Sequence, residues 1–328
     1  MHMKLIVDAL PNASKNLEKN IWADYVELLC LINIDHEISL SDLTERSKEE
    51  EQEENSKEEY GVAEKNDRLR QHYADVFRYI ITRSEIFQDD YPFELVDEDT
   101  IGLRTFPYTI GQQLYLFLLF ASNLSCFSKT DRDILTKAFE SMSREVLQLV
   151  YPQFTVNIFG TSRDSGELFS GGNLIERLKL LADCLNTTLT ESALNNPRYK
   201  HPSGDRGIDL VGFAQVESDK ARSPFIPAWF AQCACSSEEW KGKQYSVQYE
   251  TIRNMFNNLS HYSEFIVVPF SLRGPDGRWA ETEADNIVAT PIDRVRFLQI
   301  TALYGRDNNF FESSVASQIV ADICKEIV

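Results

Sequence analysis

Basic residues are scarce in this sequence relative to acidic ones. Its 328 residues include 33 Lys and Arg against 51 Asp and Glu, which gives a formal net charge of −18 at pH 7. A protein that coats nucleic acid without specificity needs clustered cations to displace the counterions of the phosphates. The net negative charge argues against that class of protein, whereas a local basic site is compatible with the same net charge.

The sequence also lacks the marks of a secreted, zinc-clipped or membrane protein. Its six cysteines are scattered without CxxC pairs, and the CxC formed by Cys233 and Cys235 has no His or second Cys pair nearby in the sequence. The most apolar stretch, 112–127, is too short for a bilayer span, and the N-terminus is too polar for a signal peptide. We therefore expect a reducing, cytoplasmic location and no membrane role.

Helical periodicity dominates the first part of the chain. Apolar residues recur at helical spacing over 21–31, 66–87, 110–127 and 130–149. The pattern predicts that residues 1–150 are a mainly helical region, for which we expect a regulatory or assembly role.

Two features stand out within this helical region. Residues 21–46 resemble a small helix-turn-helix or winged-helix piece in which Ser41 caps the second helix, and their acidic surroundings favour protein docking over DNA binding. The run 48–59 has heavy like charge and no apolar periodicity. It predicts an acidic linker near residues 45–65, either disordered or a solvated helix extension.

The character of the sequence changes after residue 150. Short apolar runs at 207–213, 228–234 and 264–270 are typical of strands, and 238–259 has helical spacing between the second and third. A further short strand is expected within 151–160, followed by an amphipathic helix over 171–186. The fold class is therefore α+β or α/β, with a mixed central sheet flanked by helices in a domain covering 151–328.

One carboxylate, Asp209, lies in the first of these apolar runs. A buried acid is costly unless a cation, a helix N-terminus or catalysis accounts for it. Mg²⁺ binds hard oxygen ligands and retains several waters, so Asp209, the oxygen of Gln232 and phosphate oxygens suffice to hold it, while a nearby Lys offsets charge in the transition state. The alternatives are that Asp209 caps a turn or pairs with Arg206, and that Gln232 only hydrogen-bonds a sheet edge.

The segments "GDRGIDLVGF" and "FAQCACSSEEWKGK" resemble the restriction-endonuclease-like superfamily, whose motif is PD-(D/E)xK, in a branch with Gln in place of the second acid. The resemblance covers about residues 150–300. Asp209 matches the metal-binding acid, Gln232 the second strand position, and Lys243 a lysine that follows a Trp by three residues. Arg206 departs from the family's usual glycine.

The resemblance implies a metal-dependent DNA endonuclease that uses Mg²⁺ or Mn²⁺ and serves bacterial antiphage defence. It also implies a partner protein and a homo-oligomer. It also implies that Glu176 is an additional metal ligand. Ala234 stands where the family's usual lysine is found, so either Lys243 reaches back into the site or the site is inactive. The alternatives to a nuclease are a noncatalytic interaction subunit with a nuclease fold and a transcription-regulator module joined to an inert domain.

Overall fold

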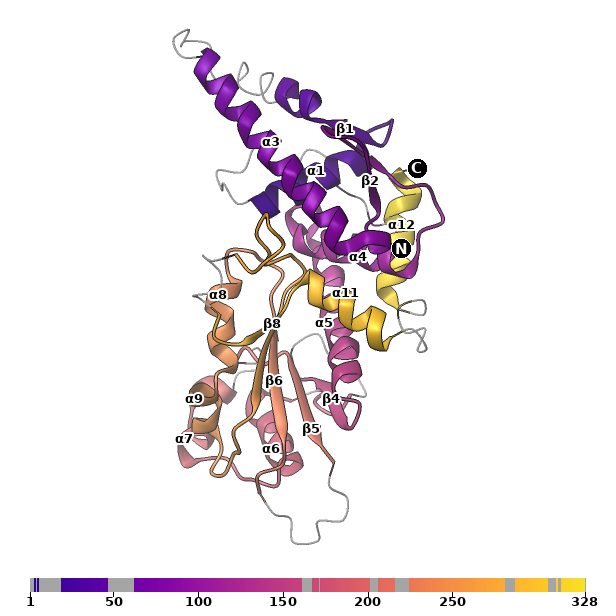
Figure 1. Cartoon of the computed structure of the whole chain (residues 1–328). Coiled ribbons are helices and arrows are strands. Elements are labelled where there is room, and N and C mark those ends of the chain that lie inside the picture. The colour runs from indigo at the N-terminus through magenta and orange to yellow at the C-terminus, as the bar shows by residue number, and fades with distance from the viewer. Residues whose placement is uncertain are drawn as a thin grey trace. The chain divides into compact units, whose positions relative to one another are not determined.

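The computed structural model describes most of the chain, which divides into two compact units (Figure 1). The described residues are 3, 5, 19–46, 62–160, 167–170, 172–200, 206–215, 224–280, 287–305, 311 and 314–327. Unit 1 comprises Met1–Arg132, Ser271–Ala284 and Ser317–Val328, and unit 2 comprises Asp133–Phe270 and Asp285–Ala316. The predicted boundary at residue 150 stays a prediction, and the acidic run 48–59 lies outside the described residues.

Unit 1 combines helices with a small antiparallel sheet. Its elements are α1 (Lys19–Ile32), β1 (Glu37–Ser39), a helix over 40–46, α3 (Val62–Phe87), η2 (Gln88–Asp90), β2 (Phe93–Asp97), β3 (Thr100–Leu103), α4 (Ile110–Ser122), η3 (Leu124–Cys126) and most of α12 (Val315–Ile327). The strand order is β1-β3-β2, with both pairings antiparallel. The antiparallel β2–β3 pair is called the wing below.

The predicted helices of this region are confirmed, but its sheet was missed and one cap differs. Ser39, not Ser41, caps the helix over 40–46, because the backbone N–H of Asp42 donates to the hydroxyl of Ser39 at 3.2 Å. Helix α4 begins with a capping box between Thr109 and Gln112. All its residues from Leu114 to Ala121 are fully buried, as expected for a core helix.

A buried ionic cluster lies in the core of unit 1. Arg83 of α3 is 1% exposed and its Nη1 atom lies 2.7 Å from both Asp24 and Glu27 of α1. The hydroxyls of Tyr91 and Tyr115 donate to the Glu27 carboxylate at 2.8 and 2.9 Å. These hydrogen bonds offset the cost of burying the charges, so the loss of one partner would leave an uncompensated charge in the core.

Unit 2 contains a mixed five-stranded sheet flanked by helices (Figure 1). Its elements are α5 (Lys129–Val150, which begins in unit 1), β4 (Phe154–Ile158), α6 (Leu174–Cys184), α7 (Glu191–Leu194), η4 (Pro197–Lys200), β5 (Leu210–Ala214), β6 (Ala228–Cys233), α8 (Trp240–Lys243), η5 (Gln244–Val247), α9 (Tyr249–Ile252), η6 (Arg253–Met255), β7 (Ser263–Val267), β8 (Thr290–Ile292) and α11 (Arg294–Tyr304). The predicted mixed sheet between flanking helices is confirmed.

The strand order is β4-β5-β6-β7-β8, and its pairings place the end of β6 beside the start of β5. The β4–β5 and β5–β6 pairs are antiparallel, whereas β6–β7 and β7–β8 are parallel. Gly212 of β5 faces Trp229 of β6, where a β-carbon would lie 2.1 Å from the indole. The glycine therefore allows the Trp229 ring to pack flat across β5 and hold the two strands in register.

The region 238–259, predicted to be one helix, is broken into short pieces. Gln248 is extended (φ −59°, ψ 140°), and the backbone N–H of Tyr249 donates to the carboxylate of Glu264 instead of to a carbonyl one turn earlier. A side chain on a neighbouring strand thus takes over a helical hydrogen bond and ends the helix. In the part of the chain that the structure describes, no helix is both long and apolar enough to cross a membrane.

Candidate functional site

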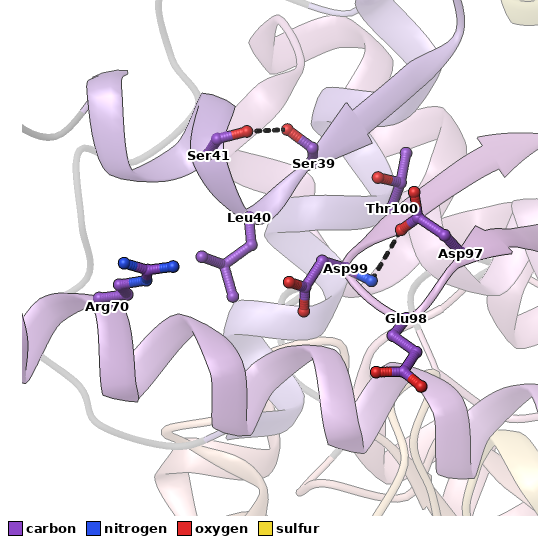
Figure 2. Close-up of a pocket in the computed structure, with 8 residues that line it drawn as sticks. All are labelled: Ser39, Leu40, Ser41, Arg70, Asp97, Glu98, Asp99 and Thr100. Carbon is purple, nitrogen blue, oxygen red and sulfur yellow. Dashed lines mark hydrogen bonds between the residues drawn. The ribbon is translucent and has the colours of Figure 1, made fainter.

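A hollow of about 490 Å³ opens beside the wing of unit 1 (Figure 2). It is lined by Ser39, Leu40, Ser41, Arg70, Asp97, Glu98, Asp99 and Thr100. In Figure 2 the guanidinium of Arg70 lies on one side of Leu40 and the carboxylate of Asp99 on the other. The lining has three carboxylates against one guanidinium, so its charge repels phosphate and does not suit DNA.

The sheet of unit 2 brings Asp209 and Gln232 into direct contact. Asp209 immediately precedes β5 and Gln232 is the last but one residue of β6, so the antiparallel pairing sets them at one end of the sheet. The Gln232 amide nitrogen donates to Asp209 Oδ2 at 2.5 Å, and the backbone N–H of Cys233 donates to the same oxygen at 2.8 Å. The two side chains are only 5% and 7% exposed.

The backbone around Asp209 is held as firmly as its side chain. Its N–H donates to the carbonyl of Ala231 at 3.0 Å, and its own carbonyl accepts from the N–H groups of Phe159 and Gly160 at 2.7 and 3.1 Å. Asp209 is thus fixed between β4 and β6. A carboxylate fixed by the backbone on both sides is preorganised for a ligand rather than free to turn into solvent.

A second carboxylate, Glu140 of α5, lies beside Asp209. A β-carbon at Gly160 would lie 3.1 Å from Asp209 Oδ1 and 3.5 Å from Glu140 Oε2. Because both distances run from one point, the two oxygens lie within about 7 Å of each other, a span that a cation with ligands at about 2.0 to 2.6 Å bridges directly or through water. We call Asp209, Gln232 and Glu140 the Asp209 cluster.

Sequence reasoning missed Glu140, although the sequence contained a signal for it. Glu140 is 7% exposed, and it follows Phe139 on the buried side of an amphipathic helix, one turn before the fully buried Ser143. An acid on the apolar side of a predicted helix is as unusual as an acid in an apolar strand, and the same question of what compensates its charge applies to both.

The charges around the Asp209 cluster affect the pKa values of Cys233 and Cys235, the two cysteines after Gln232. Burial, with the nearby negative charges of Asp209 and Glu140, raises the pKa of Cys233 well above its usual value. Burial and the charge of Glu140 also raise the pKa of Cys235 to about 12, which the charge of Lys243 opposes. Lys243 therefore lies near the same end of β6 as both carboxylates.

Lys243 and its neighbour Lys241 differ in their surroundings. Lys243 Nζ lies 3.2 Å from Glu239 Oε2, and its side chain is 39% exposed. Lys241 instead places its ammonium 5.9 Å from the ring centroid of the buried Trp240. Trp240 anchors α8 as the sequence indicated, and the charge of Lys243 acts on Cys235, two residues after the end of β6.

Glu176, the further metal ligand that the resemblance implies, takes part in a helix cap. Glu176 is exposed in the first turn of α6, where its carboxylate accepts from the backbone N–H of Asn173 at 3.3 Å and its own N–H donates to Asn173 Oδ1 at 3.1 Å. This is a reciprocal capping box, which accounts for an acid at that position. Its predicted role as a metal ligand stays a prediction.

The donor set of the Asp209 cluster fits a hard divalent cation. Gln232 Oε1 is buried without a hydrogen-bond partner among the described residues, and Gln232 Nε2 also donates to the Cys233 carbonyl at 3.3 Å. The amide nitrogen thus lies between Asp209 Oδ2 and the Cys233 carbonyl oxygen, and a cation would compete with it for that position. Residues with described coordinates include no group of three or more His, Cys, Asp or Glu suited to a metal. The set here is two carboxylates and an amide oxygen, which suits Mg²⁺ with several retained waters.

Comparisons of this chain with protein-family models, with curated protein sequences and with solved structures found no match.

Proposed function

We propose that this chain is a metal-dependent DNA endonuclease whose active site is the Asp209 cluster with Lys243. The observation that carries the proposal is the buried contact between Asp209 and Gln232 at the meeting of β5 and β6, with Glu140 beside it. The resemblance of the two segments around these residues to restriction-endonuclease-like proteins points to the same chemistry.

The cation ligands would come from Asp209, Glu140 and the amide oxygen of Gln232. Mg²⁺ or Mn²⁺, when bound there, would polarise the phosphodiester and make a bound water more acidic. Glu140 takes the role that the sequence assigned to Glu176. Gln232 is neutral, so it supplies an oxygen ligand without adding a third negative charge to repel the DNA.

The remaining steps belong to the protein's own groups. Asp209, held on both sides by backbone hydrogen bonds, orients the phosphate and the attacking water. Hydrolysis adds this water across one P–O bond, so that the phosphorus gains a hydroxyl oxygen and the leaving sugar oxygen gains a proton. Lys243 would offset the negative charge that develops on the phosphate oxygens once its pairing with Glu239 opens.

A noncatalytic subunit with the same fold is the second candidate. Two observations favour it: the side chain of Ala234 is fully buried where the family's lysine is usual, and Lys243 is paired with Glu239. The proposed DNA partner, a regulatory partner protein and a role in antiphage defence all rest on the nuclease proposal. The net charge of −18 fits a nuclease whose access to DNA is restrained until a partner supplies basic surface.

The test is cleavage of supercoiled plasmid DNA by the full-length protein with Mg²⁺, with Mn²⁺ and with a chelator, alone and with proteins encoded alongside it. We expect nicking or linearisation that needs the metal and that Asp209→Asn abolishes. A folded wild-type protein that is inactive under every condition supports the noncatalytic subunit, and cleavage by Asp209→Asn at the wild-type rate removes the proposed site.

A further inference from the structure

Arg206 occupies a backbone conformation that favours glycine. Its φ is +58°, in the left-handed region, and the following Gly207 has φ +74°. A residue with a β-carbon is strained there, and the turn that this segment resembles has glycine at the position of Arg206. Strain of this kind persists at sites where the side chain has a function, so the arginine needs an explanation beyond the turn.

The side chain of Arg206 packs against an aromatic ring. Its guanidinium carbon lies 5.4 Å from the ring centroid of Tyr199 in η4, and that ring is 5% exposed. Arg206 itself is exposed, and among the residues that the structure describes it makes no ion pair. A buried aromatic ring thus orients the cation, and the ring contact uses none of the guanidinium's hydrogen-bond donors.

The turn that carries Arg206 lies directly against the Asp209 cluster. A β-carbon at Gly207 would lie 2.7 Å from Gln232 Oε1. Since consecutive Cα atoms are about 3.8 Å apart, the Arg206 Cα lies within about 8 Å of that oxygen. Asp209 itself follows Arg206 by three residues. The backbone of Arg206 therefore lies at the rim of the cluster.

We propose that Arg206 binds a DNA backbone phosphate adjacent to the one held at the Asp209 cluster. This inference rests on the proposed nuclease function. A guanidinium presents paired donors that match two phosphate oxygens, which a glycine at this position cannot supply. In a chain with such an acidic balance, a fixed cation at the rim compensates the repulsion that the DNA strand meets there.

The test measures DNA binding separately from cleavage. A short fluorescein-labelled duplex is titrated with full-length Asp209→Asn protein in Ca²⁺ over a series of salt concentrations, with and without Arg206→Gly. Glycine suits the left-handed conformation, so this change removes the side chain and relieves strain. Arg206→Lys, which keeps the charge, is the second variant.

Arg253→Ala is the matched control. Arg253 also lies 5.4 Å from a tyrosine ring, that of Tyr249, but it has an ordinary φ of −55°. The backbone N–H of Tyr249 donates to Glu264 at the start of β7, whereas Gln232 lies near the end of the parallel β6. The control thus removes the same charge and a similar ring contact at the other end of the sheet, together with an exposed ion pair between Arg253 and Glu250 at 3.7 Å.

We expect Arg206→Gly to weaken duplex binding by about tenfold or more and to lower the slope of log K against log salt by about 0.9. Arg206→Lys should retain part of the affinity, and Arg253→Ala should have little effect. The melting temperature of Arg206→Gly should be unchanged or raised.

Three outcomes would contradict this inference. If the Asp209→Asn protein binds the duplex and Arg206→Gly weakens that binding no more than Arg253→Ala does, the inference is overturned and the nuclease proposal stands. A marked fall in melting temperature for both Arg206 variants assigns the arginine a structural role and also overturns it. Absence of duplex binding by both wild type and Asp209→Asn removes the nuclease proposal and this inference together.

Discussion

Two replacements of Asp209 should separate the electrostatic cost of the Asp209 cluster from its hydrogen bonds. Asp209→Ala removes the acceptor of two buried donors, the Gln232 amide and the Cys233 N–H. Asp209→Asn keeps one acceptor oxygen. Both remove a negative charge that lies near Glu140. From the sequence alone, a carboxylate that gathers a cation predicts unchanged or raised stability on replacement, and the two hydrogen bonds change that expectation for alanine.

The magnitudes follow from these contacts. Each buried donor left without an acceptor costs about 1 to 3 kcal/mol. Two negative charges within about 7 Å repel by about 2 kcal/mol at an effective dielectric constant of about 20. Alanine leaves both donors without an acceptor and gains the relief of repulsion, which gives a net loss of roughly 0 to 4 kcal/mol. Both donors go to the same oxygen of Asp209, so the oxygen of asparagine serves both. Asparagine gains the same relief of repulsion and should therefore be as stable as wild type or up to about 2 kcal/mol more stable.

Urea unfolding of the three full-length proteins without metal measures these differences. We expect Asp209→Asn to be as stable as wild type or more stable, and Asp209→Ala to be about 2 kcal/mol less stable than wild type. Adding Mg²⁺ should stabilise wild type and not the two variants, because a ligand that binds only the folded state raises its stability. An alanine variant more stable than the asparagine variant would refute the assigned hydrogen bonds.

Three further predictions concern other residues. Lys243→Ala should lower plasmid cleavage about 10²-fold or more while Lys241→Ala changes it little, and the reverse pattern in the same assay would show that the wrong lysine was chosen. Arg83→Ala should lower the free energy of unfolding by about 3 to 5 kcal/mol in urea because it leaves a buried carboxylate unpaired; a loss below 1 kcal/mol, roughly the scale of an exposed pair, contradicts the buried cluster. Burial lowers the pKa of His72 in the folded protein. The contribution of His72 to stability is therefore fully present above about pH 6.5, where the imidazole of the unfolded chain is neutral. This contribution is lost as the pH falls from about 6.5 through the lower folded pKa. Melting temperatures of wild type and His72→Phe from pH 7.5 down to 5 check this, and equal pH dependence of the two proteins argues against it.

The larger elements were predictable because their patterns are long. Helix α4 and helix α5 repeat apolar residues over several turns, and the runs that became β5, β6 and β7 are continuous apolar segments bounded by polar ones. The three-residue strands β1 and β8 were missed because so short a segment shows no period. The region 238–259 kept a helical period while Glu264, distant in sequence, took one of its backbone hydrogen bonds.

The candidate site was predictable only where an unusual residue marked a strand. Asp209 was found because it interrupts an apolar run, and its contact with Gln232 followed from pairing two neighbouring strands. Choosing between Glu140 and Glu176 was beyond the sequence, since both are acids on amphipathic helices. In the folded chain Glu140 is buried beside Gly160, which is a tertiary contact, and Glu176 forms a local capping box with Asn173. These contacts distinguish the two acids only once the chain is folded.

Isothermal titration calorimetry of Mn²⁺ into full-length protein tests the central claim most directly, namely that Asp209 and Glu140 hold a divalent cation. Wild type, Asp209→Asn, Glu140→Gln and the control Glu176→Gln are each titrated with and without a short DNA duplex. We predict binding by wild type that Asp209→Asn abolishes, that Glu140→Gln weakens about tenfold or more, and that Glu176→Gln leaves unchanged. Wild-type protein that binds no Mn²⁺ in either condition, or binding that depends on Glu176 and not on Glu140, would contradict the account.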